Sequence, residues 1–564
     1  MRRDITTLIA ISVIFCFALA PNTLCAQESK RVEVTTYYLP EVSEASKIDV
    51  PVRINDEPVI HPDIEYSVNP ETWQIELNPY TFKPATATYW DYNRASHFYA
   101  KLGAGYPLLT VGKLHYMTQN ERVGYFGVGV DHDGDFALRV TPTGVERTMA
   151  QSYAMNNRVA MQGGVFAGKR MFEATVNYDY DIYNTYADIA DDPFRQQFHD
   201  IGAGVRFGDD FADLSRLNFD VEIHGGYWSH PTYDAINNAS MSAIQELRIG
   251  GTARAARIFG KNRVGATIGY DLWSDGDRGA YSDSRAMIGV DYARKFGIVD
   301  IDAGVMYMYD KVEAREKASH FVMPHAKVLV DLQKAAFAPY AEFRTTVSQN
   351  GVRELYKQNP FIDYALLRPT LETMPNTRSY DVAIGFSGSA WSKRLAYRAY
   401  AGFNFIRNQL FWYMTQIGWF GVHAADNTRS FVGVEVECQP VGGLNIALGF
   451  YAHANNNDCP YLDSESKMTA DIKVEYIHKR WKVYAKADVF GRREWSGEIN
   501  GEGVAPLAFE MPTMVDLGVG VSFRATRFVE VYVDGLNLLN KRIYDFAHYY
   551  RPGAGFNAGV KLHF

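Results

Sequence analysis

The feature that most constrains this chain is a strict alternation of apolar and polar residues over segments of about ten residues. In "FEATVNYDYDI", residues 172–182, every even-numbered residue is apolar or aromatic, and every odd-numbered residue is polar or acidic. Residues 299–309, "VDIDAGVMYMY", and 481–489, "WKVYAKADV", repeat the pattern with odd-numbered apolar residues. Because side chains of a strand alternate between its two faces, each segment predicts a strand with one apolar face and one polar face.

The connections between these segments alternate in length. Short connections fall at 167–170, 259–262, 294–297, 478–481 and 524–527, and longer ones at 183–195, 228–239, 310–318, 348–378 and 455–466. Outer-membrane barrels have this asymmetry, with tight periplasmic turns and longer extracellular loops, and their tilted strands need only about 9–11 residues to span the membrane. A large soluble β-protein is the alternative, since its strands also alternate.

The predicted fold class is all-β: a closed antiparallel transmembrane β-barrel of about 22 strands between Ala95 and Phe564, an even number as in other single-chain outer-membrane barrels. Closure is required because an open sheet edge would leave unpaired backbone groups in hydrocarbon. The last strand, residues 556–564, should therefore pair with a first strand near 95–105. Residues 408–423 allow a different count, because the long strand predicted there could contain a hairpin.

The N-terminus predicts export. Residues 1–26 contain Arg2 and Arg3, an apolar run from about Leu8 to Ala20 and small residues before Gln27, which is typical of a secretory signal peptide cleaved after Ala26. A retained membrane anchor is the alternative. Residues 27–94 are rich in Pro, Asp and Glu, alternate only weakly, and are expected to form an extended periplasmic segment before the barrel of residues 95–564.

Charge and cysteine content exclude other classes. A net charge of −8 gives no reason to expect a nucleic-acid partner. Two of the four cysteines lie within the predicted signal peptide. The other two, Cys438 and Cys459, should lie at opposite ends of the barrel and remain unpaired, so disulfides are not expected to hold the fold.

The C-terminal residues 533–564, "VDGLNLLNKRIYDFAHYYRPGAGFNAGVKLHF", resemble the C-terminal signature of TonB-dependent outer-membrane receptors. The matching positions are Asn537, Leu538, Leu539, Asn540, Lys541, Tyr544, Pro552, Gly553 and Phe556, while Ala554 replaces an arginine of that signature. The resemblance implies a barrel embedded in outer-membrane lipid, whose last strand is recognised by the barrel-assembly machinery through its terminal aromatic residue, here Phe564.

The chain departs from that family at its N-terminus. Members carry a plug domain of well over 100 residues before the barrel, whereas residues 27–94 are too few and lack its Gly- and Arg-rich patterns. The stretch "RVEVTTY" at 31–37 is similar to a TonB box, a short extended segment that pairs with a partner's edge strand. A TonB partner and a lipoprotein partner are both retained as hypotheses.

Two sets of residues are candidates for function. Polar positions of the predicted strands should line the lumen, namely Asp179, Asp271, Asp302, Lys482 and Asp488. The run "LFWYMTQIGWF", residues 410–420, contributes Phe411, Trp412, Tyr413, Trp419 and Phe420. These aromatic residues predict either a girdle at the membrane interface, which is favoured, or a stacking platform for a ligand at the extracellular mouth. Residues 353–370 are expected either to cap the lumen or to dock a partner.

Catalytic, cofactor and metal sites are not predicted. The fourteen histidines show no metal-ligand spacing. "DHDGD" at 131–135 lacks the glycine and glutamate positions of a calcium loop and is interpreted as a solvated turn. "GFSGS" at 385–389 fails the nucleophile-elbow pattern, so there is no positive case for an enzyme.

Transport is the first functional hypothesis. A barrel this wide would leave a water-filled hole unless residues 27–94, the long loops or a separate protein occluded it. The alternative is an occluded barrel that serves as a binding or scaffold component of an outer-membrane complex. The sequence does not identify the solute.

Overall fold

The structure, a computed structural model, describes residues 97–564 except 121–122, 141–148, 187–194, 212, 231–232, 235–238, 241–243, 276–281, 313–317, 333–335, 364–373, 462 and 498–507. The predicted signal peptide, the periplasmic segment 27–94 and the TonB-box-like residues 31–37 lie outside the described residues. Among the residues that are described, no helix is both long and apolar enough to cross a membrane.

The main sheet has 24 strands, of which 22 pair side by side in a closed antiparallel ring. This confirms the predicted fold class and strand count. The ring consists of β1 (Phe98–Tyr106), β2 (Leu109–Asn120), β3 (Gly124–Asp135), β6 (Ala154–Ala167), β7 (Arg170–Asn184), β8 (Arg195–Asp209), β9 (Asn218–His230), β12 (Ile244–Phe259), β13 (Asn262–Asp275), β14 (Ser282–Phe296), β15 (Val299–Lys311), β16 (Ser319–Val330), β17 (Ala338–Ser348), β18 (Thr377–Ala390), β19 (Leu395–Gln416), β20 (Trp419–Cys438), β21 (Leu444–Asn456), β22 (Met468–His478), β23 (Trp481–Phe490), β26 (Met514–Arg524), β27 (Val529–Leu536) and β30 (Gly555–His563).

The remaining elements lie in the longer connections. They are β4 (Leu138–Val140), β5 (Met149–Gln151), β10 (Tyr233–Asp234), β11 (Ala239–Ser240), α2 (Val352–Gln358), β24 (Arg493–Gly497), β25 (Ala508–Met511), β28 (Tyr544–Phe546) and β29 (Tyr549–Tyr550).

The ring closes where β30 pairs with β1, as the sequence predicts. The register runs from Tyr99 opposite His563 to Tyr106 opposite Phe556. At the chain end, the backbone N–H of Phe98 donates to the carbonyl of Phe564 (3.0 Å), and the N–H of Phe564 donates to the carbonyl of Phe98 (2.9 Å). β30 also pairs with β27, so the last strand is held on both edges.

The strand faces differ as predicted from the alternation. On β7, the apolar residues Phe172, Val176 and Tyr178 are exposed, while the polar residues between them are half-buried. The same exposed apolar face recurs around the ring, for example at Leu102, Ile201, Ile249, Ile288, Val305 and Ile384. An apolar outer face is what a lipid-embedded barrel requires, so the polar residues line its inner face.

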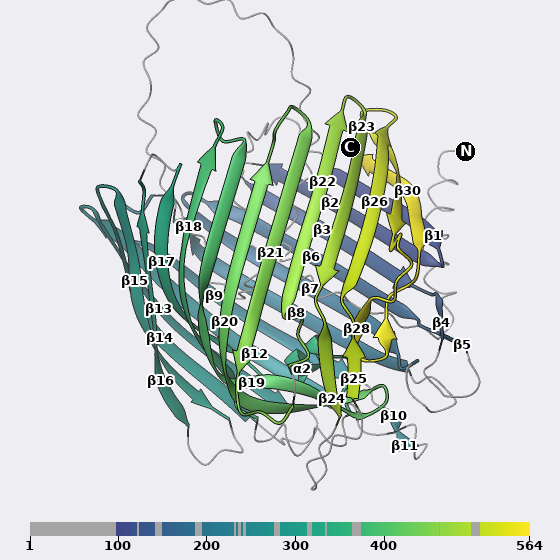
Figure 1. The fold of residues 1–564 in the computed structure, drawn as a ribbon. Coiled ribbons are helices and arrows are strands. Elements are labelled where there is room, and N and C mark those ends of the chain that lie inside the picture. The colour runs from purple at the N-terminus through teal and green to yellow at the C-terminus, as the bar shows by residue number, and fades with distance from the viewer. Residues whose placement is uncertain are drawn as a thin grey trace, which may run out of the picture.

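The two ends of the barrel are built differently (Figure 1). The short connections and the C-terminus lie at the upper end, and the long connections with α2, β24 and β25 lie at the lower end. By the convention for outer-membrane barrels, the upper end is periplasmic and the lower end extracellular. Cys438 ends β20 at the periplasmic side, Cys459 follows β21 at the extracellular side, and both are free thiols.

One strand pair is longer than the others. β19 and β20 have 22 and 20 residues, and their register shifts between Ile406 and Gln409. Asn408 has a φ of 57° at this shift, in the left-handed region that asparagine tolerates better than most residues. Beyond this bulge the hairpin continues away from the barrel wall and reaches β24. Residues 408–423, for which the sequence allowed a hidden hairpin, thus contain the tip of the β19–β20 hairpin. The predicted number of strands is unchanged.

The interpretation of 131–135 as a solvated turn was wrong. These residues form the end of β3, and Asp131 accepts a hydrogen bond from His115 Nε2 on β2 at 2.9 Å. The alternating aspartates of this stretch lie on one face of β3, where the register places Asp131 opposite Lys113 on β2.

Closure of the ring leads to a testable prediction at Gly559. A Cβ atom at this position would overlap the backbone oxygen of Leu102 on β1, and backbone cannot move aside without breaking the ladder. Gly559→Leu should therefore abolish the folded fraction, measured as the fast-migrating band of unheated protein in electrophoresis. Gly442→Leu is the matched control, because nothing lies within 4 Å of a Cβ there. Wild-type levels of folded Gly559→Leu protein would contradict the importance of this close approach.

Candidate functional site: lumen wall and extracellular cap

The five predicted lumen residues all lie on inner strand faces, opposite the exposed apolar side chains, and each lies close to a histidine or to a side chain of opposite charge. They are spread over β7, β13, β15 and β23, so the structure does not bring them together into one site. The pairs are Asp179 Oδ1 with Arg158 Nε (3.4 Å), Asp271 Oδ1 with His224 Nε2 (3.4 Å), Asp302 Oδ1 with His325 Nε2 (3.5 Å), Lys482 Nζ with Glu475 Oε2 (3.2 Å), and Asp488 Oδ2 with Lys486 Nζ (3.8 Å).

Four extracellular connections fold together over the mouth of the barrel. We call this assembly the cap and define it as residues 349–363, 409–425, 493–497, 508–511 and 543–550. These segments come from the connections β17–β18, β19–β20, β23–β26 and β27–β30. Their buried apolar residues form one continuous cluster with residues from the extracellular ends of β7, β8, β9 and β12 and with Tyr153 and Tyr186. The cap is therefore a small hydrophobic core placed at one end of a barrel that otherwise has polar walls.

Backbone bonds join the segments of the cap. The N–H of Phe420, at the tip of the β19–β20 hairpin, donates to the carbonyl of Phe361 (3.0 Å), and the N–H of Asp363 donates to the carbonyl of Phe420 (2.9 Å). β19 also pairs with β24 in parallel, with Tyr413 opposite Ser496. These bonds satisfy the backbone groups that the tip buries.

Aromatic contacts fill the centre of the cap. The rings of Phe361 and Tyr549 are stacked with centroids 3.6 Å apart, and Phe420 packs on Trp495 at 4.8 Å. The hydroxyl of Tyr549 donates to the carbonyl of Gly418 (3.0 Å). Phe361, Phe420 and Tyr549 are all 1% exposed or less, so this centre is sealed from water.

A second tyrosine ties the cap to the connection that follows β7. Tyr186 follows β7, and its hydroxyl accepts the N–H of Tyr550 (2.8 Å) and donates to the Tyr550 carbonyl (3.2 Å). Burial raises the pKa of Tyr186, so the hydroxyl stays protonated and remains a donor. Arg139 Nε donates to the same carbonyl at 3.1 Å.

Helix α2 is clamped to the barrel wall by charge. The carboxylate of Asp200 on β8 accepts hydrogen bonds from Arg353 Nε of α2 (2.8 Å) and from the Arg248 guanidinium of β12 (2.9 Å). It also forms an ion pair with Lys357 Nζ of α2 (2.9 Å). Burial disfavours the charge on Arg353, but Glu354 and Asp200 hold its pKa above the ordinary value. Three cations on one buried carboxylate fix α2 against β8 and β12.

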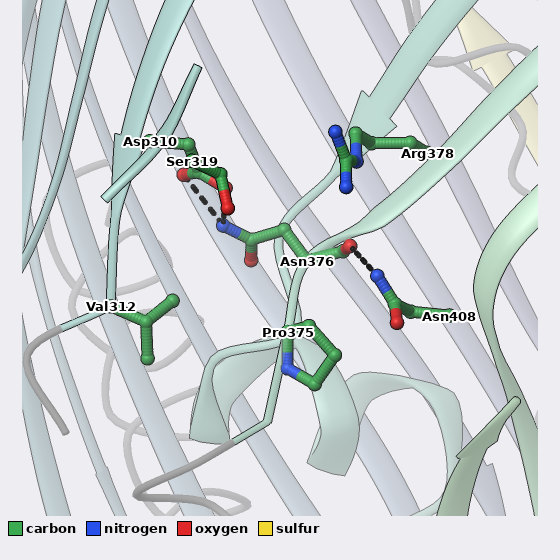
Figure 2. Close-up of a pocket in the computed structure, with 7 residues that line it drawn as sticks. All are labelled: Asp310, Val312, Ser319, Pro375, Asn376, Arg378 and Asn408. Atoms are coloured by element: carbon green, nitrogen blue, oxygen red, sulfur yellow. Dashed lines mark hydrogen bonds between the residues drawn. The ribbon is translucent and has the colours of Figure 1, made fainter. Parts of the chain in front are cut away.

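The base of the hairpin is locked by asparagines (Figure 2). The side chain of Asn376, just before β18, donates to both carboxylate oxygens of Asp310 at 2.8 and 2.9 Å, and Asn408 donates to the Asn376 carbonyl at 3.1 Å. A cavity between these residues has a volume of about 10 Å³. This is room for about one water molecule, so the cavity is no solute site.

The aromatic run 410–420 lies in the cap, where burial excludes both predicted roles for Phe411, Trp412 and Phe420. Phe411, Trp412 and Phe420 are buried in the cap core, Tyr413 stacks on Tyr461 with centroids 4.3 Å apart, and Trp419 is half-buried at the hairpin tip. Phe411, Trp412 and Phe420 form neither a lipid-facing girdle nor an open platform, because the bulge at Asn408 turns the hairpin away from the membrane.

Sequence reasoning missed the residues that hold the cap together. Asp200, Tyr186 and Tyr549 stand in otherwise ordinary alternating or loop segments, and no local pattern marks them. Two stretches noted in the sequence did lead to the cap. They are the aromatic run 410–420 and the loop 353–370, whose described part, 353–363, contributes Leu355, Phe361 and Ile362 to the cluster.

The cap core can be tested at Tyr549. Tyr549→Ala should remove about 3–5 kcal/mol of cap stability, because it deletes a buried aromatic ring. Tyr549→Phe should remove only about 1 kcal/mol, because it deletes one hydrogen bond. Limited proteolysis of the folded protein should cut within the cap faster in Tyr549→Ala. Phe403→Ala is the control, since Phe403 is exposed on β19 on the periplasmic side of the bulge. Equal cleavage rates in all variants would show that the ring does not hold the cap.

The clamp can be tested at Asp200. Asp200→Asn removes the carboxylate that Arg353, Lys357 and Arg248 share and should destabilise α2 by about 3–5 kcal/mol. Asp300→Asn, in an exposed pair with Lys295, should change stability by less than about 1 kcal/mol. Hydrogen exchange of the α2 amides reports the difference. Unchanged protection in Asp200→Asn would mean that packing alone holds the helix.

Comparison with known proteins shows no matching family model and no matching curated protein. Solved structures do match. The copper transporter OprC is 12% identical, with a TM-score of 0.63, 84% of this chain covered and 82% of that one. The FrpB iron transporter from Neisseria meningitidis is 10% identical, with a TM-score of 0.65 and the same coverage. The ferric enterobactin receptor PfeA from Pseudomonas aeruginosa is 9% identical, with a TM-score of 0.63 and coverage of 83% and 80%.

These neighbours and the closed ring agree with the resemblance carried by residues 533–564. The apolar outer face and the shared architecture fit a location in the outer membrane. The chain therefore has the 22-stranded barrel fold of the TonB-dependent outer-membrane receptors.

Proposed function

We propose that this barrel passes a solute across the outer membrane and that the cap is its closed extracellular gate. The observation that carries the proposal is the contrast between the two parts of the lumen. The wall is lined by paired charges, which suit a hydrated path, whereas the mouth is covered by a buried aromatic core. A barrel of 22 strands is too wide for its own side chains to fill, so its permeability depends on what covers it.

The barrel architecture alone does not determine which solute is transported. The three structural neighbours are named for copper, iron and ferric enterobactin, so the same architecture serves different cargoes. The binding function must therefore come from side chains particular to this chain. The paired charges of Asp179, Asp271, Asp302, Lys482 and Asp488 are proposed to line the path without selecting strongly for one sign of charge.

The N-terminal part of the chain is proposed to act on the periplasmic side of the barrel. In this proposal residues 1–26 direct export, residues 27–94 replace a full plug, and residues 31–37 contact a TonB partner. Phe564 is proposed as the signal for the barrel-assembly machinery. Support comes from the sequence resemblance and from the position of the C-terminus at the short-turn end of the barrel.

The alternative function is a binding or scaffold component, with a lipoprotein or another outer-membrane protein as partner. The extensive bonding of the cap favours this alternative over a freely open pore, since four connections share one core. Neither proposal involves catalysis, and the neighbours are transporters and receptors.

Conductance separates the two functions. We expect almost no conductance from the full-length protein in a planar bilayer, and large steps when residues 410–424 are replaced by Asn-Gly in a protein that also lacks 27–94. Gln409 and Ala425 are paired across the hairpin, so a two-residue turn can join them.

The two single deletions identify the barrier. Large steps from the 410–424 replacement alone assign the gate to the cap, and large steps from the 27–94 deletion alone assign it to the N-terminal segment. Absence of conductance in the double deletion, when that protein is folded by electrophoresis, would reject transport through the lumen and favour the scaffold.

A further inference from the structure

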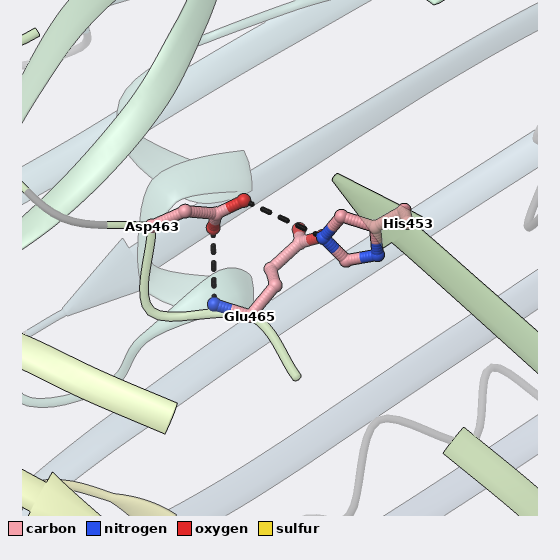
Figure 3. A group of neighbouring side chains, drawn as sticks. All are labelled: His453, Asp463 and Glu465. Carbon is pink, nitrogen blue, oxygen red and sulfur yellow. Dashed lines mark hydrogen bonds and ion pairs between the residues drawn. The ribbon is translucent and has the colours of Figure 1, made fainter. Parts of the chain in front are cut away.

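Outside the cap, three potential metal ligands meet at the extracellular end of β21 (Figure 3). His453 lies near the end of that strand, and Asp463 and Glu465 lie in the connection to β22. A ring nitrogen and one oxygen of each carboxylate all lie within 4.8 Å of one another. We propose that these residues form a binding site for a divalent transition-metal ion such as Zn²⁺.

The first support is the imidazole of His453, which makes no hydrogen bond. The side chain of His453 is 0% exposed, and neither ring nitrogen has a hydrogen-bond partner. Buried polar groups without partners are rare because they lose their hydration without compensation. The ring points toward the two carboxylates (Figure 3), so a ligand between them would supply the missing partner.

The second support is the spacing. His453 Nε2 and Asp463 Oδ2 are 3.7 Å apart, which is too long for a hydrogen bond. Two ligands that each lie about 2.0–2.1 Å from one tetrahedral Zn²⁺ are roughly 3.3 Å apart. The two atoms therefore need to approach by only a few tenths of an ångström to share an ion.

The donor set suits the same class of ion. One imidazole and two carboxylates are ligands that Zn²⁺ accepts, and three protein ligands leave a fourth position for water. The side chain of Glu465 is 52% exposed, so an ion can enter from the solvent and Glu465 can adjust to it. Nδ1 of His453 has no hydrogen-bond partner, so the ring proton can lie on Nδ1 when the lone pair of Nε2 binds an ion.

Arg429 on β20 now neutralises the two carboxylates. Its guanidinium lies 3.2 Å from Asp463 Oδ2 and 3.0 Å from Glu465 Oε2, and its Nε donates to Asn455 Oδ1 at 3.0 Å. Asp463 also accepts hydrogen bonds from the side chain of Asn455 and from the N–H of Glu465. A bound cation must displace the guanidinium from the carboxylates, while the bond from Arg429 Nε to Asn455 can remain. Arg429 is thus a built-in competitor of the metal.

The bound ion would tie the β21–β22 connection to β21. It would replace contacts of one long, flexible arginine side chain by three direct coordinate bonds. Metal binding should therefore raise the thermal stability of the folded protein and protect the connection 457–467 from proteases.

The test is Zn²⁺ titration of the full-length protein in detergent, purified without a polyhistidine tag and stripped with a chelator. Calorimetry should give one site per chain, and Co²⁺ should give the visible absorption of a tetrahedral nitrogen and oxygen site. His453→Gln and Asp463→Asn should each weaken binding at least about tenfold. Glu465→Gln should do the same, and it serves as the safeguard for folding because this side chain is exposed.

Two further variants test whether Zn²⁺ binding depends on this particular cluster. Arg429→Gln should strengthen Zn²⁺ binding at least about tenfold, since the competing charge is removed. His423→Gln should leave binding unchanged, because His423 is exposed and lies outside the cluster. Unaltered Zn²⁺ affinity in folded His453→Gln and Glu465→Gln, or weaker binding in Arg429→Gln, would overturn the proposal and leave an arginine–carboxylate latch without a metal.

Discussion

The structure depends on the pairing of every backbone group that lies in hydrocarbon. Water is absent there, so each strand must find partners on both edges, and the only solution for a sheet is a closed ring. The pairing of β30 with β1 meets this requirement, and the mutual hydrogen bonds of Phe98 and Phe564 extend it to the last residue of the chain. Once the ring is closed, the apolar outer face, the polar inner face and the two unlike ends follow from the alternation along each strand.

A closed barrel of this size has no central core, and this explains where the apolar interior of the protein is found. The wall is one strand thick, its outer face meets lipid, and its inner face carries charges in pairs. The largest buried cluster is therefore built from loops at the extracellular end, where Phe361, Phe420 and Tyr549 meet. Ion pairs on Asp200 and hydrogen bonds on Tyr186 join this cluster to the wall. The cap is held together by the same kinds of contact as a small soluble domain, although it is built from separate connections.

Sequence reasoning was successful where structure is local and failed where it depends on distant segments. The alternation along 172–182 is a property of neighbouring residues, so strands, faces, count and closure were all predictable. The run 410–420 has the same composition as an interfacial girdle, and only the bulge at Asn408 sends it into the cap. His453, Asp463 and Arg429 come from three segments that the register of β20 and β21 brings together. No spacing along the chain encodes that register, which is why the cluster had no signature in the sequence.

The place of Tyr549 in the chain links the cap to the closure of the ring. The cap core contains Phe361, the β19–β20 tip and Tyr549, and Tyr549 stands only a few residues before β30. β30 in turn pairs with β1 and β27. The same short stretch of chain thus serves both the extracellular cluster and the seam of the barrel wall.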